Sequence, residues 1–167
     1  MAIYPIRTFP DPVLHLKASP ILSFDNDLAR LIEDMFETMY EVPGVGLAAP
    51  QIGISKQVFV ADIGEGPFAM VNPQIVEAEG KWRYEEGCLS VPDRYWQIKR
   101  HDYARARGFD VDGAPVMFEG DELMGRVLQH EIDHLDGLLL LSHLSARIKR
   151  VALKELREQS LGIARSR

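Results

Sequence analysis

Two histidines four residues apart are the strongest chemical signal in the sequence. They belong to the run His130-Glu131-Ile132-Asp133-His134, an HExxH pattern. On a helix such residues lie one turn apart on the same face, so both imidazoles can bind one metal ion. Glu131 lies at the flank of that face, where its carboxylate can serve as general base for a metal-bound water. The alternative is a solvated helix whose histidines only cap or pair, because so short a pattern also arises by chance.

Cys88 is the only cysteine in the chain, so it cannot form an internal disulfide. A lone cysteine is most often a small buried hydrophobe, but this one is also the only soft anionic candidate for a third ligand. It lies in EGCLSVP, where Gly87 leaves the approach open and Pro92 ends a strand, so an exposed strand end can face the helix. A thiolate and two imidazoles leave the fourth tetrahedral position to water, which is the open geometry of a catalytic site. This ligand set suits one divalent ion, and Zn²⁺, Fe²⁺, Co²⁺ and Ni²⁺ are all compatible with it.

Hydrophobic periodicity predicts three helices that surround or carry these residues. In the histidine segment, apolar residues recur at helical spacing until Gly137 offers a stop; they are Leu123, Val127, Leu128, Ile132 and Leu135. The same spacing extends over residues 25–41, with Asp25 or Asn26 as the N-terminal cap. A basic amphipathic helix is predicted from about Ser142 to Gln159.

The segments between the first two helices read as short antiparallel strands separated by glycine-containing turns. Residues 44–53, GVGLAAPQIG, contain too much glycine and proline for a helix, and we expect a loop or a short extended segment there. The order of elements predicts an α+β fold. Its central HExxH helix is clasped by short antiparallel β-sheets, with an N-terminal and a C-terminal helix.

Length and composition are those of one globular domain. The 167 residues are 46% hydrophobic and 26% charged, and we expect residues 1–167 to form a single catalytic domain. No apolar stretch is long enough to cross a bilayer, and the N-terminus has the pattern of neither a signal peptide nor a transit peptide. We therefore expect a cytoplasmic protein without membrane contact. The formal net charge of −6 argues against non-specific binding to DNA.

Three segments resemble, in order and spacing, the three motifs of the peptide deformylase family. They are GVGLAAPQIG at 44–53, EGCLSVP at 86–92 and QHEIDHLDG at 129–137, and the similarity continues from about Pro5 to Ser145. The resemblance implies hydrolysis of the N-formyl group from the N-terminal formylmethionine of nascent polypeptides, with release of formate. It also favours Fe²⁺ as the metal in the cell. Glu131 would accept the proton of the attacking water and later protonate the departing amine.

The resemblance assigns further residues around the metal. The side-chain amide of Gln51 and the backbone N–H of Leu89 would donate to the developing oxyanion. The backbone of Gly46 would meet the substrate peptide, although glycine is equally common in a simple turn. The methionine side chain would enter an apolar pocket, whose candidate lining residues could equally be ordinary core; they are Val45, Leu128 and Val127.

Charged residues also match positions of the family pattern. Glu86 and Arg100 are expected to form an ion pair that orients the cysteine loop, and the alternative is an exposed pair of little consequence. Arg126 stands where some relatives have an apolar pocket residue, which leaves the depth of the pocket open. The remaining histidines lack partners at ligand spacing and are expected at the surface; they are His15, His101 and His143.

The C-terminal segment differs in charge from the rest of the chain. From Ser145 onward its seven basic residues outweigh Glu155 and Glu158, a balance of +5; they are Arg147, Lys149, Arg150, Lys154, Arg157, Arg165 and Arg167. A basic helix can dock on ribosomal RNA near the exit tunnel, where formylated chains emerge. The alternative is a solvated amphipathic helix that packs on its own core.

Two other functions are compatible with parts of the sequence. A zinc peptidase shares the HExxH pattern, although no third histidine or glutamate ligand is evident downstream. A non-catalytic relative could bind formylated peptides, although all the residue types that catalysis needs are present.

Overall fold

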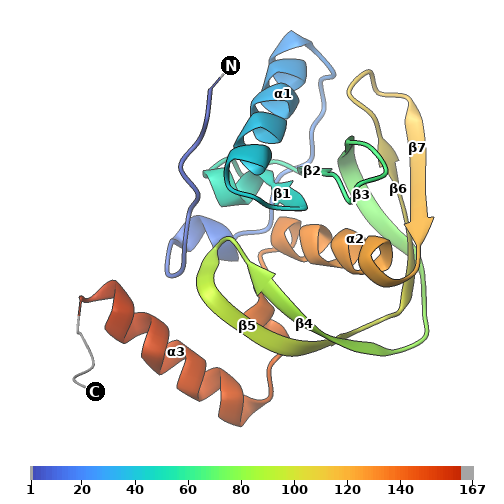
Figure 1. Cartoon of the computed structure of the whole chain (residues 1–167). Helices are drawn as coiled ribbons and strands as arrows, with labels where there is room; N and C mark the ends of the chain where they lie inside the picture. The colour runs from blue at the N-terminus through green and yellow to red at the C-terminus, as the bar shows by residue number, and fades with distance from the viewer. Residues whose placement is uncertain (1, 163–167) are drawn as a thin grey trace.

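The computed structural model describes residues 2–162, so two basic residues of the predicted tail, Arg165 and Arg167, lie outside it. Its elements in chain order are η1 (Pro12–His15), α1 (Asn26–Glu41), β1 (Gly46–Ala48), η2 (Ala49–Ile52), β2 (Val58–Ala61), β3 (Phe68–Glu79), β4 (Trp82–Cys88), β5 (Val91–Arg100), β6 (Tyr103–Phe109), β7 (Pro115–Gly120), α2 (Glu122–Leu135), η3 (Leu140–His143) and α3 (Ala146–Ser160) (Figure 1). No helix in the described range has both the length and the apolar character that crossing a membrane needs.

The strands form two antiparallel sheets. One contains five strands in the order β1-β2-β3-β6-β7, and the other is the β4–β5 hairpin. The HExxH helix α2 lies between them (Figure 1), and ion pairs of Arg100 with Asp133 and of Arg126 with Glu86 join it to the hairpin. The predicted α+β fold, with a central helix clasped by antiparallel sheets, is confirmed.

The apolar face of α2 packs against the five-stranded sheet. Val127, Leu128 and Leu135 are buried in one cluster with Phe59 of β2. The helix ends at Leu135, and Gly137 follows with φ of +75°, a left-handed conformation that glycine adopts without strain. The apolar spacing that buries this face therefore leaves the two histidines to face the end of β4.

The N-terminal helix α1 also forms where its sequence pattern indicates. The carboxylate of Asp25 accepts from the backbone N–H groups of Asp27 and Leu28 at 3.1 Å, which satisfies two donors of the first turn. The buried side of α1 packs in one apolar cluster with Leu47 of β1 and Val60 of β2. The helix thereby covers the strand that leads into residues 44–53. That segment is extended over β1, as expected, and continues as a short 3₁₀ turn that ends on Ile52.

The start of the C-terminal helix was predicted wrongly. The helix begins at Ala146 rather than near Ser142, with Ser145 as its N-cap residue. Residues 140–143 form a separate 3₁₀ turn, in which Leu140 and Leu141 are buried. Leu144 continues the apolar spacing of the helix, four residues before Ile148, but it precedes the N-cap residue, so the periodic pattern began too early.

The inner face of α3 closes a third apolar cluster behind the cysteine. Ala152 and Leu156 are buried with Val91 of β5, and Cys88 packs against the same cluster. Arg94 of β5 also donates to Glu155 of α3 at 3.0 Å. The helix is thus attached to the protein by its apolar side and an ion pair, while its basic residues lie on the outside.

Leu156→Ala should lower the free energy of unfolding by about 2–5 kcal/mol, because it removes a core side chain and leaves a cavity beneath β5. Leu156 is only 5% exposed, whereas Leu161 just beyond the helix is 74% exposed. Leu161→Ala is therefore the control and should change stability by less than about 0.5 kcal/mol. Urea denaturation of both variants measures the difference, and equal midpoints would show that α3 does not pack as described.

Candidate metal centre and active site

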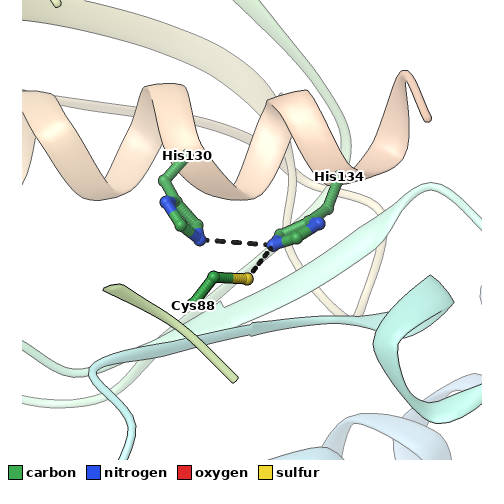
Figure 2. Close-up of side chains that lie close together, drawn as sticks. All are labelled: Cys88, His130 and His134. Atoms are coloured by element: carbon green, nitrogen blue, oxygen red, sulfur yellow. Dashed lines mark hydrogen bonds between the residues drawn. The ribbon is translucent and has the colours of Figure 1, made fainter. Parts of the chain in front are cut away.

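Cys88, His130 and His134 converge on one point from two elements. Figure 2 shows the cysteine at the end of β4 facing the two histidines, which come from successive turns of α2. The Cys88 sulfur lies 3.2 Å from Nε2 of His134, and that nitrogen lies 3.2 Å from Nε2 of His130. The three candidate ligand atoms all lie within 4.8 Å of one another. Ligand atoms about 2.0–2.3 Å from a common metal have comparable separations, so the three side chains fit one tetrahedral ion.

The electrostatics of the cluster favour the thiolate form of Cys88. Burial raises the pKa of the thiol, but the neighbouring imidazoles of His134 and His130 act more strongly and lower it well below its usual range. The thiolate is the form of cysteine that binds metals. The charge state as well as the geometry of the cluster therefore suits a divalent cation.

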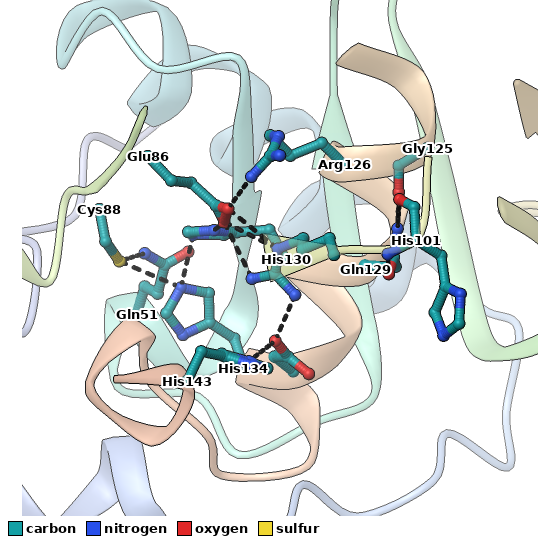
Figure 3. A network of polar contacts seen from close by, with 12 residues as sticks. Gln51, Glu86, Cys88, His101, Gly125, Arg126, Gln129, His130, His134 and His143 are labelled. Atoms are coloured by element: carbon teal, nitrogen blue, oxygen red, sulfur yellow. Dashed lines mark hydrogen bonds and ion pairs between the residues drawn. The ribbon is translucent and has the colours of Figure 1, made fainter. Parts of the chain in front are cut away.

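The Glu86–Arg100 ion pair is present, and it belongs to a larger buried network (Figure 3). Nδ1 of His130 lies 2.7 Å from Oε1 of Glu86, which directs the other ring nitrogen toward the cysteine. Arg100 also donates to Asp133 at 2.8 Å, and Asp133 lies 2.7 Å from Nε2 of His143. Burial raises the pKa of Glu86, but His130 and Arg100 outweigh it and hold the carboxyl well below its usual range. Glu86 is therefore an anion tied to a ring that faces the metal site.

Glu131 is buried beside the cluster with free hydrogen-bonding capacity. The residue is 3% exposed, and no described residue donates to its Oε2 atom. Burial raises the pKa of this carboxyl, while the imidazoles of His130 and His134 lower it, and the net effect is a raised value. A carboxylate whose proton affinity is raised and whose oxygen is unpaired can accept a proton from water.

Gly46 makes the position of Glu131 possible. A Cβ atom on Gly46 would overlap the Glu131 carboxylate, so any other residue would displace it. The family resemblance implied that Gly46 meets a substrate backbone, and the structure adds this separate steric reason for glycine. The residue also lines the cavity described below.

The amide of Gln51 is held with its nitrogen toward the cysteine. Its Oε1 atom accepts from the backbone N–H of Ala48 at 2.9 Å, which fixes the orientation of the amide. Its Nε2 atom lies 3.3 Å from the Ser90 hydroxyl and 3.8 Å from the Cys88 sulfur. Ser90 is completely buried and was not singled out from the sequence, although it is part of EGCLSVP. The amide nitrogen therefore lies beside the metal site, where it donates to Ser90 and Cys88.

A cavity of about 510 Å³ opens next to the candidate ligands, within the usual range for small-ligand sites. Val45 and Val127 line it as expected, together with Gly46, Leu89 and Leu123. The expectation that Leu128 lines the pocket is wrong, because its side chain is completely buried in the core beneath α2. The helix turns Val127 toward the cavity and Leu128 toward the five-stranded sheet, where it packs with Phe59.

The remaining histidines and the arginine also have defined places. His15 and His101 are exposed, and His143 is exposed but takes part in the Asp133 contact. Arg126 lines the cavity, where its guanidinium lies over the rings of Trp82 and Tyr84. An apolar residue of similar length would not supply a charge at this wall of the cavity.

A buried HExxH helix facing a cysteine, with an unpaired glutamate beside a cavity, defines a metal-dependent hydrolase of the α+β class. Residues 3–150 match the family model described as polypeptide deformylase. A peptide deformylase from Heliobacterium modesticaldum is 50% identical, and the match covers 83% of this chain and 92% of the relative. A peptide deformylase from Acidothermus cellulolyticus is 46% identical, and the match covers 95% of this chain and 88% of the relative. The crystal structure of a peptide deformylase from Legionella pneumophila has a TM-score of 0.90 and 41% identity, covering 99% of this chain and 100% of that one. The chain belongs to the polypeptide deformylase family, which is metal-dependent.

Proposed function

We propose that this chain hydrolyses the N-formyl group of N-terminal formylmethionine on nascent polypeptides and releases formate. The observation that carries the proposal is the buried, unpaired Glu131 carboxylate beside the Cys88, His130 and His134 cluster at a cavity wall. Family membership supports the same reaction and does not favour a zinc peptidase or a non-catalytic binding protein.

The protein groups around the cavity account for each requirement of the reaction. A divalent metal bound by Cys88, His130 and His134 would lower the pKa of a coordinated water toward about 7. Glu131 accepts a proton from the attacking water and returns it to the amine nitrogen as the bond between the formyl carbon and that nitrogen breaks. The Gln51 amide and the backbone N–H of Leu89 stabilise the negative charge on the formyl oxygen.

The cavity gives the substrate its orientation. The backbone at Gly46 pairs with the peptide, and the methionine side chain enters between Val45, Leu123 and Val127, which line the cavity. The formyl group then lies over the metal ligands and Glu131.

The experiment that tests the function compares two substrates of the metal-loaded protein. We expect formate release from formyl-Met-Ala and no cleavage of unmodified peptides of similar length. Cleavage of unmodified peptide without formate release would support the peptidase alternative instead. Binding of formylated peptide without turnover would support the non-catalytic one.

We further propose Fe²⁺ as the metal in the cell, because a thiolate with two imidazoles is compatible with ferrous iron and the family resemblance favours it. Peroxide should then inactivate the iron-loaded protein faster than the nickel-loaded protein, since iron promotes oxidation of the adjacent Cys88 sulfur. The loss of activity is measured as residual formate release, and oxidation of the sulfur is measured as the mass of the peptide that contains Cys88. Equal inactivation rates for both metal forms would argue against an iron enzyme.

The basic outer face of α3 is proposed to dock on the ribosome near the exit tunnel. Arg147, Arg150 and Arg157 are exposed, while the opposite side of the helix packs on the core. In keeping with this setting, we propose that residues 1–167 act as one catalytic domain in the cytoplasm.

Neutralising all three arginines to glutamine should weaken cosedimentation with ribosomes at low salt and leave activity on short formyl peptides intact. The matched control removes the same charge at exposed Arg83 and Lys99 of the β4–β5 hairpin and at exposed Lys81 just before it. Equal cosedimentation of the two triple variants would show that the basic face of α3 has no specific role in ribosome binding.

A further inference from the structure

Arg126 is a buried cation one helical turn before His130. It is 4% exposed and projects from α2 toward the β4–β5 hairpin, where its Nη1 atom lies 2.5 Å from Oε2 of Glu86 (Figure 3). The resemblance to relatives suggested only a pocket residue at this position. The contact with Glu86 links it to the network that holds the metal ligand.

The hydrogen bonds to Glu86 divide unevenly between its two oxygens. Oε1 faces Nδ1 of His130 and the Nη2 atom of Arg100, at 2.7 and 2.9 Å. Nε of Arg100 is shared, at 2.9 Å from both oxygens. Among the described residues, Arg126 alone contacts Oε2 without also contacting Oε1. Arg100 and Arg126 together therefore fix the rotation of the carboxylate, and Arg126 supplies the contact that draws Oε2 away from His130.

The aromatic residues of β4 support the guanidinium from the side. Its central carbon lies 4.7 Å from the ring centroid of Trp82 and 5.4 Å from that of Tyr84, and the two rings stack on each other. Cations are attracted to such ring faces. The Nε and Nη2 atoms of Arg126 have no hydrogen-bond partner among the described residues. Burial of these donors is unfavourable, so the contact with Glu86 and the rings is what keeps the arginine in place.

We propose that Arg126 is a positioning residue for the metal centre, which fixes the Glu86 carboxylate and through it the ring of His130. Outer hydrogen-bond partners of a metal-binding histidine hold its ring orientation and its basicity. The proposal rests on the metal site of the proposed function and not on the identity of the substrate. Arg126 also walls the cavity, so the test has to separate metal binding from substrate binding.

The test measures how fast Co²⁺ leaves the full-length protein in excess EDTA, followed by the visible absorption of the cobalt-thiolate site. Arg126→Met should release Co²⁺ about 10- to 100-fold faster than the wild type and shift its absorption bands. Arg126→Lys, which keeps the charge but not the planar fork, should fall between the two. The apo form of Arg126→Met should remain folded, because Glu86 keeps its ion pair with Arg100 and is not left as an unpaired buried charge.

Arg105→Met is the matched control, because Arg105 makes ion pairs with Glu77 and Glu119 on the five-stranded sheet, away from the cavity. It should release Co²⁺ at the wild-type rate. If Arg126→Met does not fold, Arg126→Gln replaces it with the same expected acceleration. Release within about twofold of wild type in the folded variant, with only KM for formyl-Met-Ala altered, would reduce Arg126 to a pocket wall and overturn the proposal.

The same measurements separate failure of the proposed function from failure of the proposal about Arg126. A wild-type protein that holds Co²⁺ but releases no formate contradicts the function and leaves the release rates of the variants as a valid test of Arg126. A wild-type protein that binds no Co²⁺ overturns the proposal about Arg126 together with the metal site.

Discussion

Glu131→Gln should lower kcat for formyl-Met-Ala by about 10²- to 10⁴-fold while the protein keeps its metal, because the substitution removes a proton acceptor and changes no proposed ligand. Glutamine has nearly the same shape as glutamate, so the cavity and the packing around it are preserved. The carboxylate is buried with an unpaired oxygen, and no other described carboxylate has this combination in the cavity. We expect KM to change little, since the loss falls on the transition state.

The control for this prediction is Glu122→Gln, which makes the same chemical change at an exposed position of the same helix. It should retain wild-type kcat. Metal content of both variants is measured beside formate release. Full activity of Glu131→Gln with metal bound would exclude Glu131 as the base.

Gly46→Ala should lower kcat/KM by about 10²-fold, comparable to the cost of displacing a catalytic group by roughly 1 Å. The new methyl group would occupy the space of the Glu131 carboxylate, and the strand β1 that carries it is fully buried and cannot yield easily. The candidate metal ligands come from β4 and α2, so metal content should be unchanged.

A double-mutant cycle separates this steric effect from a direct contact of Gly46 with the peptide. If the methyl group acts through Glu131, then Gly46→Ala combined with Glu131→Gln should be hardly slower than Glu131→Gln alone. Losses that multiply in the double variant would show that Gly46 acts on the substrate independently of Glu131. The measurement is kcat/KM for formate release by the four proteins of the cycle.

The parts of the structure that sequence patterns predicted are those governed by local spacing. The limits of α1 and α2 follow from apolar periodicity, the Asp25 cap and Gly137, which act within a few residues. The convergence of Cys88 with the histidines was predicted because the chemistry of a metal site requires it, and the structure brings these residues together.

The parts that were missed depend on contacts between distant segments. Arg126 and Glu86 are separated by 40 positions, and Gln51 and Ser90 are separated by 39. No local sequence pattern can therefore predict either hydrogen bond. Leu128 was misplaced because a single helical step of rotation decides between core and cavity. Both types of error arise where the relative orientation of two elements, rather than the periodicity of one, determines the contact.

The three candidate ligands come from two separate elements, and this affects the thermal stability of the protein. The cysteine ends β4 and the histidines belong to α2, so a bound cation would join hairpin and helix in addition to the ion pairs between them. A cation that binds only the folded chain stabilises it by about 2.7 kcal/mol at a free concentration one hundred times its Kd. The melting temperature of this protein should therefore rise with the supply of its metal, and cells short of that metal would lose the protein to unfolding as well as to inactivity.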